Sequence, residues 1–455
     1  MKERLSGIRE GVEIDIGGGM RMRMQIQELR TKALSALLSH VSSFFHNFSD
    51  LFRQAPFSLL FCSFTGLLAG IGLSLMTGML QALPGLMILI PPAIAMRGNI
   101  YSALVSRLGT SMHLGLFSPT LKRGGVLYQN ASASLSLTLI LSVILGFLAK
   151  IAAHAFGMPN IEYLSLHGFI LISVLSGLIS GIILLGIALL VSIIGYHRNW
   201  DLDNVSSPII TSAGDMITIP SLLVAALLLI KLEVFSNRWI FGGWLSPITL
   251  LSMLFIVAAF FCAIKGLKSN DAAVRRILVE SIPMLFICGV LGTIAGISLN
   301  MELESLIALP AILVLIPPFL GESNALGGIL SARLSSMLHI GTVEPKPFPD
   351  KLVSANFAVI YIFSVFLFLF VGLLSYIASI YLGIPTPDVG KMLTISLLGG
   401  ILCTTFLNFA SYYIAILSFR FGMDPDNDTI PLITSLTDVV GVLCLLFVIF
   451  IIQLF

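Results

Sequence analysis

Charged residues are scarce in this sequence. They make up 11% of the 455 residues, whereas hydrophobic residues make up 57%, and a soluble domain has about 25% charged residues. A water-soluble fold is therefore excluded. The net charge of +2 comes without a basic stripe outside the apolar segments, so we expect no nucleic-acid partner. The five cysteines stand singly within apolar stretches, without metal-ligand spacing, and we interpret them as small buried hydrophobic residues.

The apolar residues are instead gathered in long runs without charge. Each run is about 20 residues or longer, which is enough to cross a ~30 Å hydrocarbon core. The runs are apolar on every face rather than alternating, which indicates helices and not a barrel. We predict an all-α polytopic membrane protein with about eleven transmembrane helices, near residues 57–78, 83–106, 131–155, 166–196, 208–230, 243–265, 279–299, 306–332, 352–380, 390–418 and 430–453.

Positive charge is unevenly divided between the two sides of these predicted helices. If the amino terminus is inside, only Lys150, Lys231, Arg238 and Lys391 fall in external segments. Cytoplasmic loops carry an excess of lysine and arginine, so this distribution predicts orientation. We expect a multi-pass protein of the cell membrane with a cytoplasmic amino terminus and an external carboxyl terminus.

Two blocks of the sequence recur farther along the chain. A shift of 226 residues aligns Leu83-Pro84 with Leu309-Pro310, Ile90-Pro91-Pro92 with Ile316-Pro317-Pro318, and Arg107, His113 and Asn130 with Arg333, His339 and Asn356. A shift of 223 residues aligns Asp201, Asp203, Asn204, Pro208, Thr211 and Asp215 with Asp424, Asp426, Asn427, Pro431, Thr434 and Asp438. Two collinear blocks of this kind indicate an internal duplication.

Each copy has five predicted helices, so a directly following copy would be inverted. The extra helix near 243–265 returns the chain to its starting side, and the copies are therefore parallel. We predict a cytoplasmic amino-terminal segment, two repeats and a linker that contains one transmembrane helix, with boundaries at 1–50, 51–230, 231–270 and 271–455. In this arrangement one chain forms a complete pore with pseudo-two-fold symmetry.

Asp215 and Asp438 are the most informative side chains, because each lies about two turns inside an uncharged apolar helix. A carboxylate in a membrane helix is costly and indicates a functional site; the alternative is a carboxylate satisfied by a neighbouring helix. Thr211 and Thr434 precede the aspartates by four residues and so share their helix face. Hard oxygen donors from two repeats suit magnesium, which uses one or two carboxylates and retains waters.

Four further aspartates precede these helices on the predicted cytoplasmic side: Asp201, Asp203, Asp424 and Asp426. They could form an acidic mouth that concentrates cations. The alternative is ordinary helix capping before Pro208 and Pro431. The sequence leaves both interpretations open.

The segments that follow the two Pro-Pro pairs form a third group of candidates. Proline removes a backbone donor, and glycine follows soon after, so we expect these helices to be broken and to line a cavity. Asn99, Glu322 and Asn324 lie in these segments and are candidate ligands or gate residues; hydrogen bonding between helices is the alternative. Asn130 and Asn356 could either join helices or line the pore.

With these features the sequence resembles the MgtE magnesium transporters and their two-repeat relatives in solute carrier family 41. The resemblance covers about residues 50–455 and is carried by Pro91, Gly98-Asn99 and Ser106-Arg107-Leu108, and by Asp203-Asn204-Val205, Pro208 and Gly214-Asp215. It implies that Asp215 and Asp438 line a central pore and take part in magnesium binding. It also implies that the acidic pairs before these helices lie toward the cytoplasm.

The sequence departs from the family in two ways. Many bacterial members have a large cytosolic sensor, which the roughly 50 residues before the first helix cannot contain, so feedback gating by that sensor is not expected. The second copy has Gly321-Glu322-Ser323-Asn324 in place of the Gly-Asn pair, which makes the two halves of the pore chemically unequal.

These features predict transport of a divalent cation, with Mg²⁺ the first choice, and no enzyme activity. We expect no prosthetic group, since the metal ion is the cargo, and the partners are divalent ions and the lipid bilayer. A Ca²⁺ or Mn²⁺ carrier and a sodium-coupled Mg²⁺ exchanger share the same residues. A distant alternative is an intramembrane aspartyl protease, which also needs two aspartates, although Ser212-Ala213-Gly214-Asp215 lacks the first glycine of its Gly-x-Gly-Asp element.

A pore completed within one chain requires Asp215 and Asp438 to approach each other. A magnesium ion holds oxygens at ~2.1 Å and keeps waters, so carboxylates that share it lie within roughly 10 Å. We therefore expect Asp215→Cys and Asp438→Cys, combined in a chain without its native cysteines, to crosslink within the chain through short thiol-reactive reagents. Crosslinks formed only between chains, or none in a folded protein, would indicate an obligate oligomeric pore.

Overall fold

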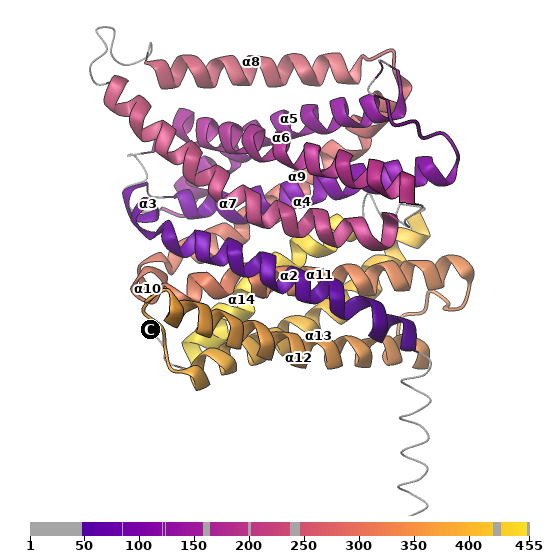
Figure 1. The fold of residues 1–455 in the computed structure, drawn as a ribbon. Helices are drawn as coiled ribbons and strands as arrows, with labels where there is room; N and C mark the ends of the chain where they lie inside the picture. Colours follow the sequence, from indigo (N-terminus) through magenta and orange to yellow (C-terminus); the bar gives the residue numbers. More distant parts are fainter. Residues whose placement is uncertain are drawn as a thin grey trace, which may run out of the picture. The chain divides into compact units, whose positions relative to one another are not determined.

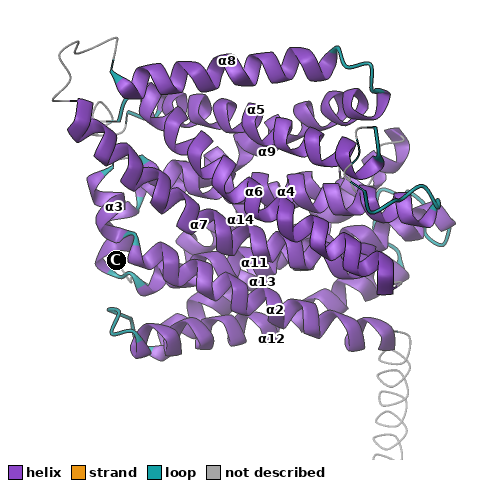
Figure 2. Ribbon diagram, turned by 45° about the horizontal axis from the view of Figure 1, so that its top comes forward, coloured by secondary structure: helices purple, strands orange, loops and turns teal. Residues whose placement is uncertain are grey.

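The computed structural model describes residues 48–83, 85–120, 122, 124–157, 164–198, 202–236, 246–421 and 429–452. These residues form helices joined by loops and contain no strand (Figure 2). The chain divides into two units, Met1–Phe57 and Ser58–Phe455; of the first, only residues 48–57 are described.

Eleven of the described helices are long and apolar enough to cross a membrane, as the sequence predicted. The protein is an all-α polytopic membrane protein in which two parallel five-helix repeats are joined by a linker helix. Repeat 1 contains α2 (Ser49–Leu75), α4 (Leu86–His113), α5 (Val126–Ala155), α6 (Leu166–Arg198) and α7 (Leu202–Ser236). Repeat 2 contains α9 (Ala272–Met301), α11 (Ala311–Ile340), α12 (Lys351–Tyr381), α13 (Val389–Phe421) and α14 (Ile430–Ile451).

Three elements complete the described fold (Figure 1). The linker helix α8 (Pro247–Leu267) packs mainly against α5 and α6, and a hydrogen bond of 2.7 Å joins Ser252 to His167 of α6. Two short helices, α3 (Thr77–Ala82) and α10 (Leu303–Ala308), occupy equivalent positions in the two repeats and were not predicted. The predicted boundaries between repeats and linker stay predictions.

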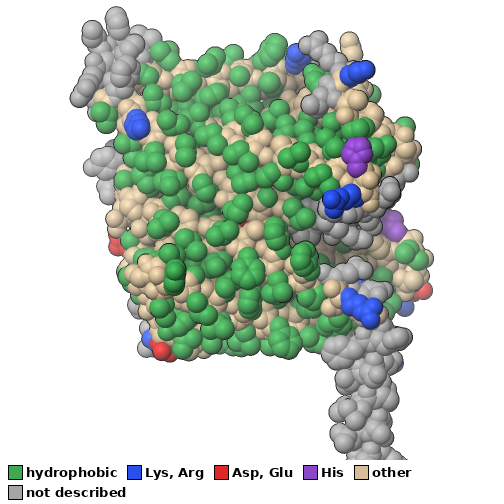
Figure 3. Space-filling view, viewed as in Figure 1, with side chains coloured by type: hydrophobic (Ala, Val, Ile, Leu, Met, Phe, Trp, Pro, Cys, Tyr) green, Lys and Arg blue, Asp and Glu red, His purple; other side chains and the backbone are tan. Residues whose placement is uncertain are grey.

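The surface seen in Figure 3 is consistent with a membrane location. Hydrophobic side chains cover the face between the two ends of the helices, and the visible lysine, arginine, aspartate and glutamate side chains lie near those ends. Helix α8 carries exposed apolar residues along its length, including Leu250, Leu254, Val257 and Phe260. A lipid-facing helix requires such a surface, because hydrocarbon offers no hydrogen bonds.

The first long helix of each repeat packs against the other repeat. Glycines provide the close approach: a Cβ at Gly66 would lie 2.6 Å from the Cα of Pro318 in α11, and one at Gly292 would lie 2.7 Å from the Cα of Pro92 in α4. One turn further along, a Cβ at Gly70 would overlap the carbonyl oxygen of Val314. Small residues allow such approach of membrane helices. The two repeats are thus interlocked by an exchange of helices.

The prediction of broken helices after the two Pro-Pro pairs is wrong. Helices α4 and α11 continue through Pro91-Pro92 and Pro317-Pro318. Pro318 has no backbone N–H to donate to the carbonyl oxygen of Val314, four residues earlier. Gly70 carries a hydrogen in place of a Cβ, and this hydrogen points at the Val314 oxygen. The exchanged helix therefore covers an acceptor that the proline leaves free, through a weak C–H···O contact. Gly296 covers the carbonyl oxygen of Ile88 in the same way, for Pro92.

The structure also decides the role of the paired asparagines. Nε of Arg107 donates a 2.9 Å hydrogen bond to Oδ1 of Asn130, and Nε of Arg333 donates an equal bond to Oδ1 of Asn356. Both asparagines lie in the second turn of helices that begin earlier than predicted, at Val126 and Lys351. Asn130 and Asn356 therefore join neighbouring helices of their own repeats.

We predict opposite effects of two glycine substitutions on stability. Gly70→Ala should destabilise the protein by about 1–3 kcal/mol, because the new methyl group overlaps the Val314 carbonyl. Gly186→Ala in α6 should stabilise it by about 0.5–1 kcal/mol, since glycine is a poor helix former and no atom beyond the adjoining part of its own helix lies within 4 Å of an added Cβ. Unfolding of the purified variants in detergent measures both. Equal effects would contradict the close packing of α2 on α11.

Candidate ion-binding site between the repeats

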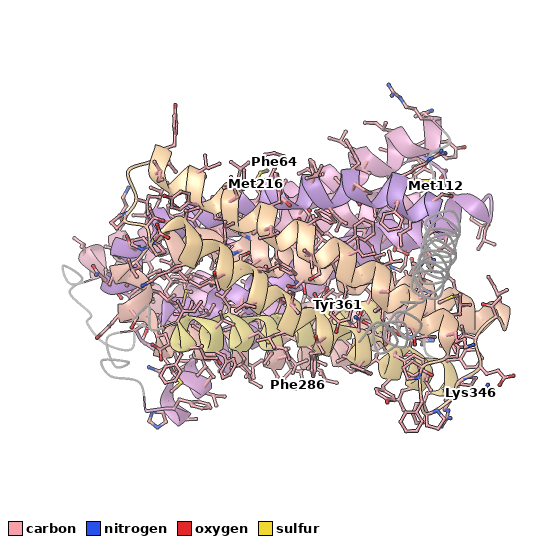
Figure 4. The ribbon with its side chains drawn as sticks, turned by 90° about the horizontal axis from the view of Figure 1, so that it is seen from below. Phe64, Met112, Met216, Phe286, Lys346 and Tyr361 are labelled. Atoms are coloured by element: carbon pink, nitrogen blue, oxygen red, sulfur yellow. The ribbon has the colours of Figure 1, made fainter. Side chains whose placement is uncertain are left out.

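Asp215 of α7 and Asp438 of α14 line the same cavity, which has a volume of about 40 Å³. Six helices from both repeats enclose it, and its remaining walls are mostly apolar, including Ile90-Pro91 and Ile316-Pro317. Met216, which follows Asp215 in α7, lies about halfway along the helices in Figure 4. A water molecule needs ~10–15 Å³ of such space. The cavity therefore has room for a few waters beside two carboxylates.

The two carboxylates have unequal surroundings. Nδ2 of Asn324 donates a 2.7 Å hydrogen bond to Oδ1 of Asp438, and Asn324 also lines the cavity. The equivalent of Asn324 in repeat 1 is Gly98, which has no side chain to offer to Asp215. Within the described part of the chain, Asp215 accepts no corresponding amide bond. The carboxylate of Asp438 is thus oriented by an amide of its own repeat, whereas the carboxylate of Asp215 has no such partner among the described residues.

Glu322 does not line the cavity, although we predicted it as a ligand. It is fully buried and accepts a hydrogen bond from the Ser63 hydroxyl, and its Oε2 has no hydrogen-bond partner. The preceding residue, Gly321, does line the cavity, and a Cβ there would lie 3.6 Å from Oδ2 of Asp215. Glu322 is therefore one residue away from the cavity wall.

Asn99 and the two threonines also lie apart from the cavity that contains the aspartates. Asn99 lines a smaller cavity of about 10 Å³, and its Oδ1 accepts a long hydrogen bond of 3.5 Å from Thr434 across the repeat boundary. The Thr434 hydroxyl also donates to the carbonyl of Ile430 in its own helix. Thr211 places its methyl group against Gly98. Both threonines thus make contacts between or within helices, and their role as ion ligands stays a prediction.

The predicted acidic mouth lies mostly beyond what the structure describes. Asp201, Asp424 and Asp426 are outside the described residues. The backbone of Asp203 belongs to the first turn of α7, which begins six residues before the predicted start at 208, but its side chain is not described. The choice between capping and cation attraction stays open.

Sequence reasoning missed Arg97, one residue before Gly98 in α4. This side chain is fully buried; its Nε donates a 3.2 Å hydrogen bond to Ser180, and its Nη2 donates a 2.9 Å bond to Ser142. The signal was present, because a basic residue within an apolar helix is a candidate for function in the same way as an aspartate. Arg97 points toward α5 and α6.

No group of three or more histidine, cysteine, aspartate and glutamate side chains that could hold a metal ion occurs among the described residues. A cation in the cavity would therefore meet two carboxylates and one amide, and water would supply the remaining ligands. Mg²⁺ accepts such a site, because it usually keeps several waters and uses only one or two carboxylates. Ca²⁺ takes six to eight oxygens and would need more donors than these side chains provide.

We predict that Asn324 is energetically coupled to Asp438 and not to Asp215. Without divalent ions, Asn324→Ala should destabilise the protein by about 1–3 kcal/mol, because Asp438 loses its buried hydrogen bond. In a double-mutant cycle most of this cost should disappear when Asp438→Ala is already present. The matched cycle with Asp215→Ala should show nearly additive effects. Similar coupling in both cycles would contradict the unequal surroundings of the two aspartates.

Comparisons with known proteins place this chain among transporters. A family model described as "MgtE: Divalent cation transporter" matches residues 90–225 and 316–448, one match in each repeat. The chain is 25% identical over 379 residues to mouse solute carrier family 41 member 2, which covers 78% of the chain and 62% of that protein. It is 25% identical over 400 residues to mouse solute carrier family 41 member 3, which covers 82% of the chain and 78% of that protein.

The chain thus spans less than two thirds of the length of member 2, and the human protein of that name gives the same coverage. No solved structure matches the chain. The family match extends over both repeats, includes Asp215 and Asp438, and replaces the protease alternative. The chain belongs to the MgtE family of divalent cation transporters.

Proposed function

We propose that this protein carries divalent cations, with Mg²⁺ the first choice, through the cavity that Asp215 and Asp438 line. The observation that carries the proposal is the convergence of these two repeat-equivalent carboxylates on one cavity in the membrane-spanning region. Both side chains are buried, with 8% and 6% of their surface exposed. Burying two carboxylates together is unfavourable without a cation, so the pair provides a reason for a positive ion to bind.

The choice of magnesium rests on the chemistry of the donors. Asp215, Asp438 and Asn324 are hard oxygen donors, which excludes a preference for soft metals. Their small number favours an ion that keeps part of its water shell, and the cavity has room for a few waters. Mn²⁺ accepts the same ligands as Mg²⁺, and Ca²⁺ would require more of them. These ions and a sodium-coupled exchange remain the alternatives.

We further propose that one chain forms the complete pathway. Both aspartates and the helices that enclose them come from a single chain, and the exchanged packing of α4 with α9 ties the two repeats together. The orientation that we propose follows the charge distribution, with the amino terminus in the cytoplasm and the carboxyl terminus outside.

Substitution of each aspartate tests the proposal. In sealed vesicles that contain the purified protein, Asp215→Ala and Asp438→Ala should each reduce Mg²⁺ flux at least about tenfold, since a lost ligand weakens ion binding by more than ~1.4 kcal/mol. Glu304→Gln, which removes an exposed carboxylate, is the matched control and should transport normally. Unchanged flux in both aspartate variants would overturn the site.

The same vesicles distinguish the ion and the coupling. Flux of Mg²⁺, Ca²⁺ and Mn²⁺ is compared with and without a sodium gradient across the membrane. We expect Mg²⁺ flux to exceed Ca²⁺ flux, because the cavity offers few protein oxygens to an ion that prefers six to eight. Flux that requires the sodium gradient would replace a simple Mg²⁺ pathway with an exchanger.

A further inference from the structure

Four charged side chains are buried in the described part of the protein: Arg97, Asp215, Glu322 and Asp438. Two of them line the cavity, and the other two do not. When all four are ionised, their charges add to −2. This sum equals the charge that one divalent cation neutralises.

Arg97 is the buried cation of this group, and among the described residues no carboxylate forms an ion pair with it. Its hydrogen bonds go to the hydroxyl groups of Ser142 and Ser180, and Nη1 has no hydrogen-bond partner. A buried guanidinium with neutral partners is costly in a membrane and indicates a functional role.

Repeat 2 shows that the fold does not need this charge. The counterparts of Arg97, Ser142 and Ser180 are Ser323, Phe368 and Cys403. Equivalent hydrogen bonds support the alignment, because Ser173 donates to the carbonyl of Ser142 and Ser396 donates to the carbonyl of Phe368.

The same space is filled by different chemistry in the two repeats. A Cβ at Gly177 would overlap Ser142 and the Arg97 guanidinium, whereas a Cβ at the equivalent Gly400 would overlap the Phe368 ring. A phenylalanine ring therefore fills in repeat 2 the space that the Ser142 hydroxyl and the Arg97 guanidinium share in repeat 1. Packing alone does not explain the arginine.

Glu322 has the converse asymmetry. Its counterpart in repeat 1 is Met96, and the counterpart of its hydrogen-bond partner Ser63 is Gly289. The methyl carbon of Met96 would lie 3.3 Å from a Cβ at Gly289, so an apolar contact replaces the polar pair of repeat 2. At neighbouring positions, repeat 1 thus carries a buried cation and repeat 2 a buried anion.

The residues that follow Arg97 and precede Glu322 in their helices pack against the segment of α7 that carries Asp215. On one side, a Cβ at Gly214 would lie 3.4 Å from the backbone nitrogen of Gly98, which follows Arg97. On the other side, a Cβ at Gly321, which precedes Glu322, would lie 3.6 Å from Oδ2 of Asp215. Charges act over longer distances in such a low-dielectric interior than in water.

We propose that Arg97 and Glu322 set the net charge of the ion site, so that the buried charges match one divalent cation. The inference rests on the proposed function. Arg97 limits the attraction that three carboxylates would exert and so permits release of the ion. Glu322 supplies the second net negative charge without touching the ion. The pair determines the valence that the site accepts.

A charge cycle tests this proposal in the full chain. Equilibrium binding of Mg²⁺ is measured by calorimetry for the wild type, Arg97→Gln, Glu322→Gln and the double variant. We expect Glu322→Gln to weaken binding about tenfold or more and Arg97→Gln to tighten it by a similar factor. The double variant restores the sum of −2 and should bind within about threefold of the wild type.

Two further variants separate charge from packing. Arg97→Lys keeps the charge and should bind Mg²⁺ like the wild type. The triple substitution Arg97→Ser, Ser142→Phe and Ser180→Cys installs the side chains of repeat 2 in repeat 1 and should tighten binding as Arg97→Gln does. This triple variant keeps the test valid if Arg97→Gln does not fold, because its three side chains already pack together in repeat 2.

The outcomes distinguish this inference from the proposed function. Weaker binding in both single variants, with the double variant weaker still, would show that Arg97 and Glu322 have structural roles, and would overturn the inference alone. Unchanged Mg²⁺ binding in both single variants would also overturn the inference alone, provided that Asp215→Ala abolishes binding. If the wild type does not bind Mg²⁺, or if Asp215→Ala binds it normally, the proposed function and the inference both fail.

Discussion

The cost of negative charge within a membrane is the constraint on which the structure depends. Asp215, Asp438 and Glu322 are buried among apolar helices, where an uncompensated carboxylate is strongly unfavourable. The fold meets this cost unequally, since Asn324 bonds Asp438 and Ser63 bonds Glu322, while Asp215 faces the cavity. A cation in the cavity would offset this cost.

Helix packing keeps this site together through the exchange of α2 and α9 between the repeats. Without that exchange, the carbonyl oxygens of Ile88 and Val314 would stay uncovered next to proline, close to the residues that line the cavity. Gly70 and Gly296 reach these oxygens because they have no side chain. The paired prolines and the paired glycines therefore act together: each glycine covers a carbonyl oxygen that a proline leaves without a hydrogen bond. This arrangement lets the helices that carry Pro92 and Pro318 cross the membrane without a break.

The sequence was sufficient for much of this structure, and the reasons for its failures are physical. Long apolar runs and the recurrence of Asp215 at Asp438 predicted eleven helices and two repeats, because hydropathy and repetition can be read from the sequence without knowledge of how the helices pack. The continuity of α4 and α11 was missed, since it depends on glycines more than 200 residues away. The position of Glu322 beside Ser63 was missed for the same reason. Arg97 was overlooked although its charge was visible in the sequence.

The fusion of two repeats into one chain makes their inequality possible. A symmetric dimer adds buried charges in equal pairs: two aspartates with two copies of Arg97 give 0, and two aspartates with two copies of Glu322 give −4. Two aspartates alone also give −2, but only a fused chain can keep this sum with Arg97 in one half and Glu322 in the other. It thereby puts residues of opposite charge next to Gly98 and Gly321, the two glycines that pack against the segment carrying Asp215. An ion in the cavity then experiences an asymmetric field, which two identical subunits could not provide at their shared axis.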